Sequence, residues 1–98
     1  MVTVNEIEVL KNEISIEINK LETVFINNKH VIDTKAQERF TKIIEFNHSN
    51  VRILDLIKLT LEKANGEELN MIELSIIDIR KSYELLIEFN HGLQHDNG

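Results

Sequence analysis

The sequence predicts an all-α fold, a small antiparallel helical bundle, from two observations. Proline is absent and the three glycines lie at Gly66, Gly92 and Gly98, so residues 1–65 lack the residues that usually interrupt helices. Apolar residues also recur every three or four positions, which places them on one helical face. A chain of 98 residues suits one domain, expected at residues 1–92 with a flexible tail at residues 93–98.

The first helix is expected at residues 4–26. Thr3 and Glu6 have the spacing of a capping box, in which each side chain accepts a hydrogen bond from the backbone N–H of the other residue. The polar run at residues 27–30 ends this helix. Its predicted buried face consists of Ile7, Leu10, Ile14, Ile18, Leu21 and Phe25.

A second helix is expected from Asp33 or Thr34 to about Asn47, and a third from about Ser49 to the Asn65–Gly66 pair. Glycine at that position can adopt the left-handed conformation that commonly ends a helix. No glycine or proline separates these two helices, so the alternative is three long helices with residues 34–64 continuous.

The last helix is expected to begin at a second capping box, Asn70 to Glu73, and to end near Gly92. Its apolar residues again follow helical spacing. The predicted buried face consists of Ile72, Ile76, Ile79, Tyr83 and Leu86.

An internal repeat favours four helices. The pentapeptide Ile-Glu-Phe-Asn-His at residues 44–48 recurs at residues 87–91. The displacement between the copies suits a helical hairpin, so we expect two duplicated αα-hairpins. Chance self-similarity in a chain rich in Ile, Glu and Asn is the alternative.

Both copies of the pentapeptide contain Glu-x-x-His, as Glu45 with His48 and Glu88 with His91. This is the ligand spacing of ferritin-like di-iron bundles, which also need a buried Glu from each of two further helices. That second pair is missing, and helical periodicity turns both copies away from the apolar faces. We therefore expect no metal and no cofactor, and keep a metal-binding bundle that uses these four residues as the alternative.

Composition argues against several classes of function. The net charge of −6 and the scattered basic residues disfavour nucleic acid. Cysteine is absent and no segment has the apolar length of a membrane span, so we expect a cytoplasmic protein with no membrane contact. The chain lacks a phosphate-binding glycine loop and the common catalytic motifs, so we expect no enzymatic activity.

Surplus apolar residues instead indicate a non-catalytic protein–protein interaction or regulatory protein, of the small acidic adaptor, chaperone or inhibitor type. We expect it to act through its helix faces as a homodimer, although burial inside the monomer is the alternative. The acids of the first helix favour a basic protein partner: Glu6, Glu8, Glu13, Glu17 and Glu22. The candidate interaction surface consists of Val9, Ile16, Leu56, Leu59, Leu74, Ile77, Leu85 and Phe89.

Overall fold

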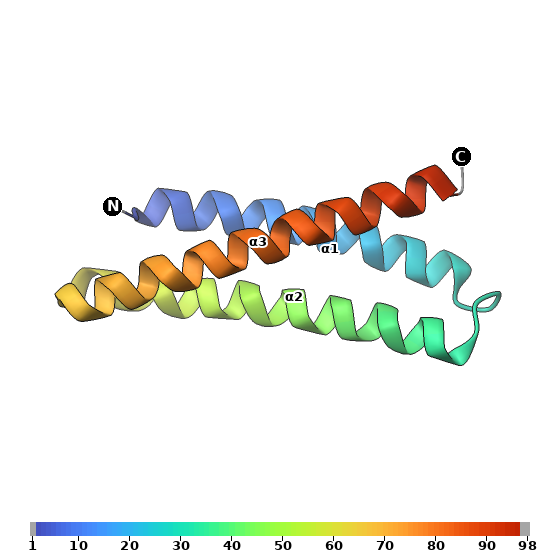
Figure 1. The fold of residues 1–98 in the computed structure, drawn as a ribbon, viewed down its shortest axis with the longest axis horizontal. Coiled ribbons are helices and arrows are strands. Elements are labelled where there is room, and N and C mark those ends of the chain that lie inside the picture. Colours follow the sequence, from blue (N-terminus) through green and yellow to red (C-terminus); the bar gives the residue numbers. More distant parts are fainter. Residues whose placement is uncertain (1, 97–98) are drawn as a thin grey trace.

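Three long helices form an elongated antiparallel bundle in the computed structural model, which describes the backbone of residues 2–96 and the side chains of residues 2–93. They are α1 (Val4–Asn28), α2 (Thr34–Thr60) and α3 (Gly66–Asp96), and a short 3-10 turn, η1 (Leu61–Lys63), follows α2 (Figure 1). The molecule measures 50 × 23 × 16 Å. Its radius of gyration is 15.5 Å, against about 13 Å for a compact domain of this length.

The all-α prediction is confirmed, but the prediction of four helices in two duplicated hairpins is wrong. The three-helix alternative fits, since helix continues through residues 48–50 to Thr60 and η1 extends it. The repeat would align the first turn, residues 29–33, with residues 72–76, which lie inside α3. The identical pentapeptides therefore do not mark two copies of one hairpin.

Local hydrogen bonds show why α2 continues without a break. Asn47 Nδ2 donates to the Ile43 carbonyl at 2.8 Å, and Arg52 Nη2 donates to Ser49 Oγ at 3.0 Å. Asn and Ser usually weaken a helix because they bond to the backbone of competing conformations. Here these side chains find partners within the helix, and no proline forces a break.

Side-chain caps begin the first two helices as predicted. Thr3 Oγ1 accepts a hydrogen bond from the Glu6 N–H at 3.1 Å at the start of α1. Asp33 Oδ1 accepts from the Ala36 N–H at 2.7 Å at the start of α2. Each cap satisfies a backbone donor that the first helical turn leaves unpaired.

The start of α3 corrects the sequence prediction. Asn65 Oδ1 accepts a hydrogen bond from the Glu68 N–H at 2.9 Å, so Asn65 caps the N-terminus of α3. Gly66 is the first residue of that helix and has a negative φ. The Asn65–Gly66 pair therefore starts a helix instead of ending one, and the predicted capping box from Asn70 to Glu73 lies inside α3.

The end of α3 also differs from the prediction. The helix does not stop near Gly92 but continues to Asp96. Residues 97 and 98 lie outside the described residues, and a flexible tail at residues 93–98 stays a prediction.

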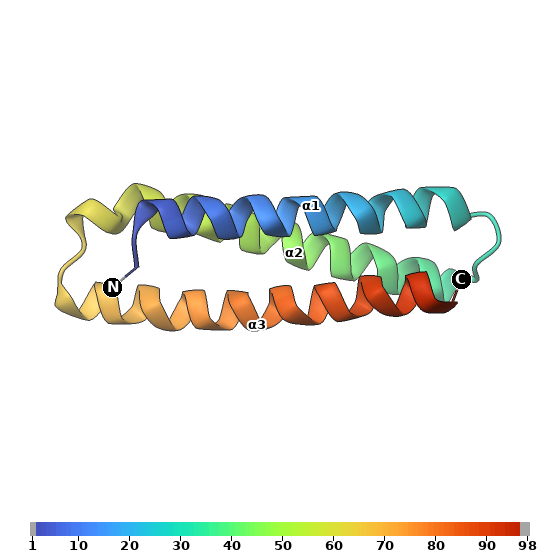
Figure 2. The same cartoon turned by 90° about the horizontal axis from the view of Figure 1, so that it is seen from above.

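The buried face of α1 forms the centre of the core. α1 packs most extensively against α2 and less against α3, while α2 and α3 touch each other least. Figure 1 shows α3 running obliquely across α1, and Figure 2 shows α2 slanting from beside α1 to beside α3. All but one of the predicted positions on α1 are at most 1% exposed: Ile7, Leu10, Ile14, Ile18 and Leu21. Phe25, the remaining one, is half-buried and stacks on Phe40 with ring centroids 5.3 Å apart.

Polar contacts add to this packing along the seam between α1 and α2. Lys11 Nζ lies 2.8 Å from Asp55 Oδ1, and Lys58 pairs with Glu8. The hydrogen bond to Asp55 raises the pKa of Lys11, and the hydrogen bond from Lys58 lowers the pKa of Glu8.

No helix in the described part of the chain is apolar enough over a sufficient length to span a membrane.

Two isoleucines of α1 test the assignment of the core. Ile14 is fully buried, whereas Ile16 is 55% exposed. Ile14→Ala removes core packing and is expected to cost about 2–5 kcal/mol of unfolding free energy, whereas Ile16→Ala should cost about 0.5 kcal/mol or less. Urea unfolding at one fixed protein concentration measures both. Equal losses for the two variants would contradict the packing of α1.

Candidate functional site: the α2/α3 face

Exposed apolar side chains gather along one side of the helix pair α2 and α3. We define the α2/α3 face by six residues that are 41% to 68% exposed: Phe46, Ile53 and Leu56 on α2, and Met71, Leu74 and Leu85 on α3. Their spacings are close to whole helical turns, so each helix presents its members on one side. An apolar strip of this length is unusual on a protein surface that meets only water.

One half of the α2/α3 face contains a groove of about 360 Å³ between α2 and α3. Apolar side chains form its walls, among them Phe46, Leu85 and Phe89, and Lys42 and Ser82 also line it. The groove lies where residues 42–47 of α2 face residues 82–89 of α3. The limited contact between these two helices leaves this space unfilled.

Asn47 lines the same groove and is itself only 3% exposed. Its Nδ2 donates to the Ile43 carbonyl, but its Oδ1 is buried without a partner among the described residues. A buried acceptor without a donor costs free energy, so this position gains from any donor that reaches it.

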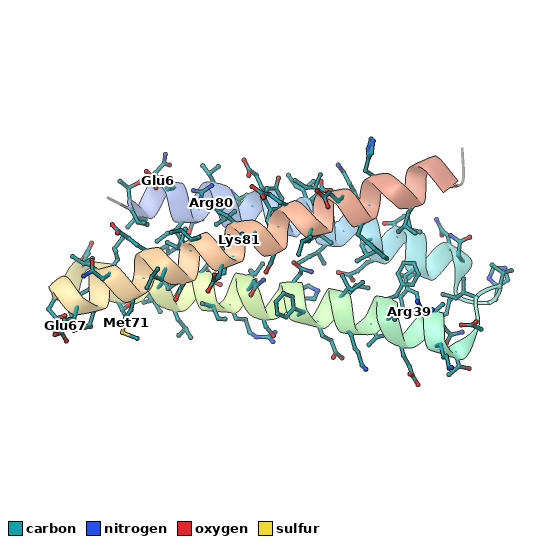
Figure 3. The ribbon with its side chains drawn as sticks, in the orientation of Figure 1. Glu6, Arg39, Glu67, Met71, Arg80 and Lys81 are labelled. Carbon is teal, nitrogen blue, oxygen red and sulfur yellow. The ribbon has the colours of Figure 1, made fainter. Side chains whose placement is uncertain are left out.

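Unpaired charges of opposite sign lie at the two ends of the molecule. Lys35, Arg39 and Lys42 are exposed near the start of α2, and Glu67 and Glu68 are exposed at the start of α3. No ion pair within the described residues involves any of these five side chains. Figure 3 shows Arg39 near one end of the molecule and Glu67 with Met71 at the other.

The structure places half of the predicted interaction residues beside one another. Leu56, Leu74 and Leu85 belong to the α2/α3 face, and Phe89 is a half-buried wall of the groove that packs edge-on against Phe40. The other four are 47% to 74% exposed but are turned away from this face by helical periodicity: Val9, Ile16, Leu59 and Ile77.

Sequence reasoning missed Phe46, Ile53 and Met71. Phe46 and Ile53 continue the strip that contains Leu56, but Lys42 and Ser49 lie on the same strip and hide its apolar character. The sequence did contain a signal for this strip. The spacing of Phe46, Ile53 and Leu56 places them on one side of α2, and the apolar residues that contact α1 lie on another side.

The two Glu-x-x-His pairs lie in separate parts of the structure. His48 Nε2 lies 3.2 Å from Glu22 Oε1 of α1, and Glu45 lines a hollow together with Glu22 and Phe25. His91 lines a hollow with Glu17 and Asn90 on the α3 side of α1, and Glu88 is exposed. Within the described residues, no group of three or more His, Cys, Asp or Glu side chains is placed to hold a metal ion.

The buried residue of each pentapeptide is its asparagine. Asn90 is 6% exposed, and its Nδ2 donates to the carbonyl of Glu17 at 3.0 Å and to Glu17 Oε1 at 3.1 Å. Asn90 therefore links α3 to α1, whereas Asn47 bonds only within α2. The same five residues thus serve an interhelical contact in one copy and the floor of the groove in the other.

The acids of α1 are mostly engaged within the molecule. Glu8 pairs with Lys58, Glu22 contacts His48, and Glu17 accepts hydrogen bonds from Lys20 and Asn90. Burial alone would raise the pKa of Glu17, but these hydrogen bonds and the charge of Lys20 outweigh it and lower the pKa. Glu8 and Glu17 are therefore paired with lysines of the protein itself, which weakens the acidic surface expected to attract a basic partner.

The lowered pKa of Glu17 predicts a loss of stability in acid. The ionised carboxylate stabilises the fold above its unfolded pKa, near 4.5, and this contribution disappears as the pH falls through the lower pKa of the folded state. Glu17→Gln keeps an acceptor for Asn90 but removes the charge, so it should flatten the pH dependence below 4.5. Urea unfolding at several pH values tests this, with Glu38→Gln at an exposed position as the control. An unchanged slope in Glu17→Gln would contradict the assignment.

Comparison with known proteins adds no relative to this chain. No protein-family model matches it, and neither a curated protein nor a solved structure does so.

Proposed function

We propose that this chain is a non-catalytic protein–protein interaction protein that acts as a homodimer through the α2/α3 face. The observation that carries the proposal is the strip of six exposed apolar residues beside the groove. A regulatory role of adaptor, chaperone or inhibitor type accords with a small acidic helical chain whose described residues bring together no metal-binding group.

The size of the α2/α3 face supports a stable contact. α2 has 27 residues, which corresponds to a length of about 40 Å. Two adjacent helices are about 20 Å wide, so the whole side of the helix pair, with the apolar face at its centre and the charged ends included, offers about 800 Å² per protomer. This is the area that each partner contributes to a standard protein–protein interface.

The molecule also has a physical reason to bury this face. Its 98 residues form a thin, elongated bundle, so a large share of its apolar surface stays in contact with water. Burying apolar area is the main favourable term in association, and two-fold dimers are the commonest assemblies. A second copy covers the face without requiring any other chain.

Paired surface variants test the homodimer. Wild-type protein is expected to elute as a dimer, and Leu74→Lys with Leu85→Lys should convert it to a folded monomer because two charges would be buried at the contact. Val9→Lys with Ile16→Lys is the matched control on the outer side of α1 and should leave the dimer intact. Light scattering on a size-exclusion column measures the mass, and circular dichroism verifies the helix content. A wild-type monomer at every accessible concentration would overturn the proposal.

A further inference from the structure

We infer that the second copy packs on the α2/α3 face in an antiparallel arrangement, which brings the basic start of α2 to the same end of the dimer as the acidic start of the partner's α3. This inference rests on the proposed homodimer and adds its orientation. Three properties of the face carry it: the segregation of its charges, the placement of its groove, and matching distances from its centre.

The charges favour inversion of one copy relative to the other. Lys35, Arg39 and Lys42 outnumber the exposed Asp33 and Glu38 at one end of the helix pair, and Glu67 and Glu68 outnumber Lys63 at the other. A two-fold axis across the long direction brings the basic end of each protomer to the acidic end of its partner. A parallel dimer would gather both sets of acids at one end and both sets of bases at the other, which is unfavourable.

The positions of the side chains fit such an axis. Residues 42–47 face residues 82–89 across the groove, so the middle of the face lies near Asn50 on α2 and Asp78 on α3. Arg39 precedes Asn50 by eleven residues and Glu67 precedes Asp78 by eleven, so both lie about 16 Å from the middle, on opposite sides. Inversion therefore brings Arg39 of one protomer level with Glu67 of the other.

The apolar residues of the face also lie at matching distances on either side of the middle. Phe46 is four residues from Asn50, and Leu74 is four residues from Asp78 on the opposite side of the middle. Leu85 and Leu56 are seven and six residues from these centres. An inverted copy thus places Leu56 and Leu74, which are 62% and 63% exposed, over the groove of its partner.

The groove can accept side chains of the second copy. It lies in one half of the face, and the exposed leucines Leu56 and Leu74 lie in the other half. Near the axis, Lys81 lies within one turn of Asp78 and offsets the repulsion between the two copies of that acid.

Cross-linking of single-cysteine variants tests the orientation, because the chain has no native cysteine. Arg39→Cys mixed with Glu67→Cys is expected to give a covalent dimer with a short bis-maleimide reagent. Either variant alone should give little cross-linked product, since equivalent residues lie at opposite ends of an antiparallel dimer. Ile53→Cys, near the middle, is the positive control and should cross-link with itself.

The outcomes separate the orientation from the dimer itself. A wild-type dimer in which Arg39→Cys cross-links with itself is parallel, and it would overturn this inference while leaving the proposed homodimer intact. A monomer by light scattering would overturn both. Cross-linking of the mixed pair, with none in the single variants, supports the antiparallel arrangement.

Charge reversal gives an independent test that needs no cross-linker. Arg39→Glu and Glu67→Arg are each expected to weaken dimerisation roughly tenfold, because each contact occurs twice in a two-fold dimer. The double variant should recover affinity close to that of the wild type, and Arg80→Glu, on the α1-facing flank of α3, should leave the dissociation constant unchanged. Sedimentation equilibrium measures these constants. Losses that merely add in the double variant would show that the two ends do not meet.

Discussion

The structure depends on the burial of one face of α1. Five side chains spaced by three or four residues are almost completely removed from water: Ile7, Leu10, Ile14, Ile18 and Leu21. No other helix has so continuous a buried face, and both α2 and α3 supply the side chains that cover it. Apolar burial of this kind dominates folding free energy, so the positions of α2 and α3 follow from their contact with α1.

The same constraint leaves the α2/α3 face open. Because α1 is covered by two helices that cross it at an angle, α2 and α3 meet each other over only a small area. The sides of α2 and α3 that are turned away from α1 carry apolar residues that α1 does not contact. In a four-helix bundle a further helix would fill that position. This chain has no fourth helix among its described residues, so the unfilled position becomes a surface on which another chain can pack.

The sequence predicted the helical class and most of the buried face because apolar periodicity is set by the core. Its errors concern helix ends and symmetry, which depend on competing local contacts. Asn65 and Gly66 suit the end of one helix and the start of the next equally well, and the hydrogen bond from the Glu68 N–H to Asn65 shows which is realised. The candidate surface stays a prediction, and the structure places only half of its residues together, because exposed apolar residues look alike in a sequence until the neighbours of each helix are known. Phe46 was missed for that reason, whereas Leu74 and Leu85 were found.

The repeated pentapeptide shows why sequence identity did not reveal symmetry. In both copies helical periodicity buries the asparagine and exposes the glutamate before it, since these features depend only on which side of the helix faces the core. The partner of the buried amide, however, depends on the distance to the next helix. Asn90 reaches Glu17 because α3 lies against α1 there, while Asn47 lines the groove between α2 and α3 and bonds only within its own helix; the Oδ1 of each asparagine is buried without a partner among the described residues. Identical residues thus strengthen the bundle in one place and mark its unfilled side in the other.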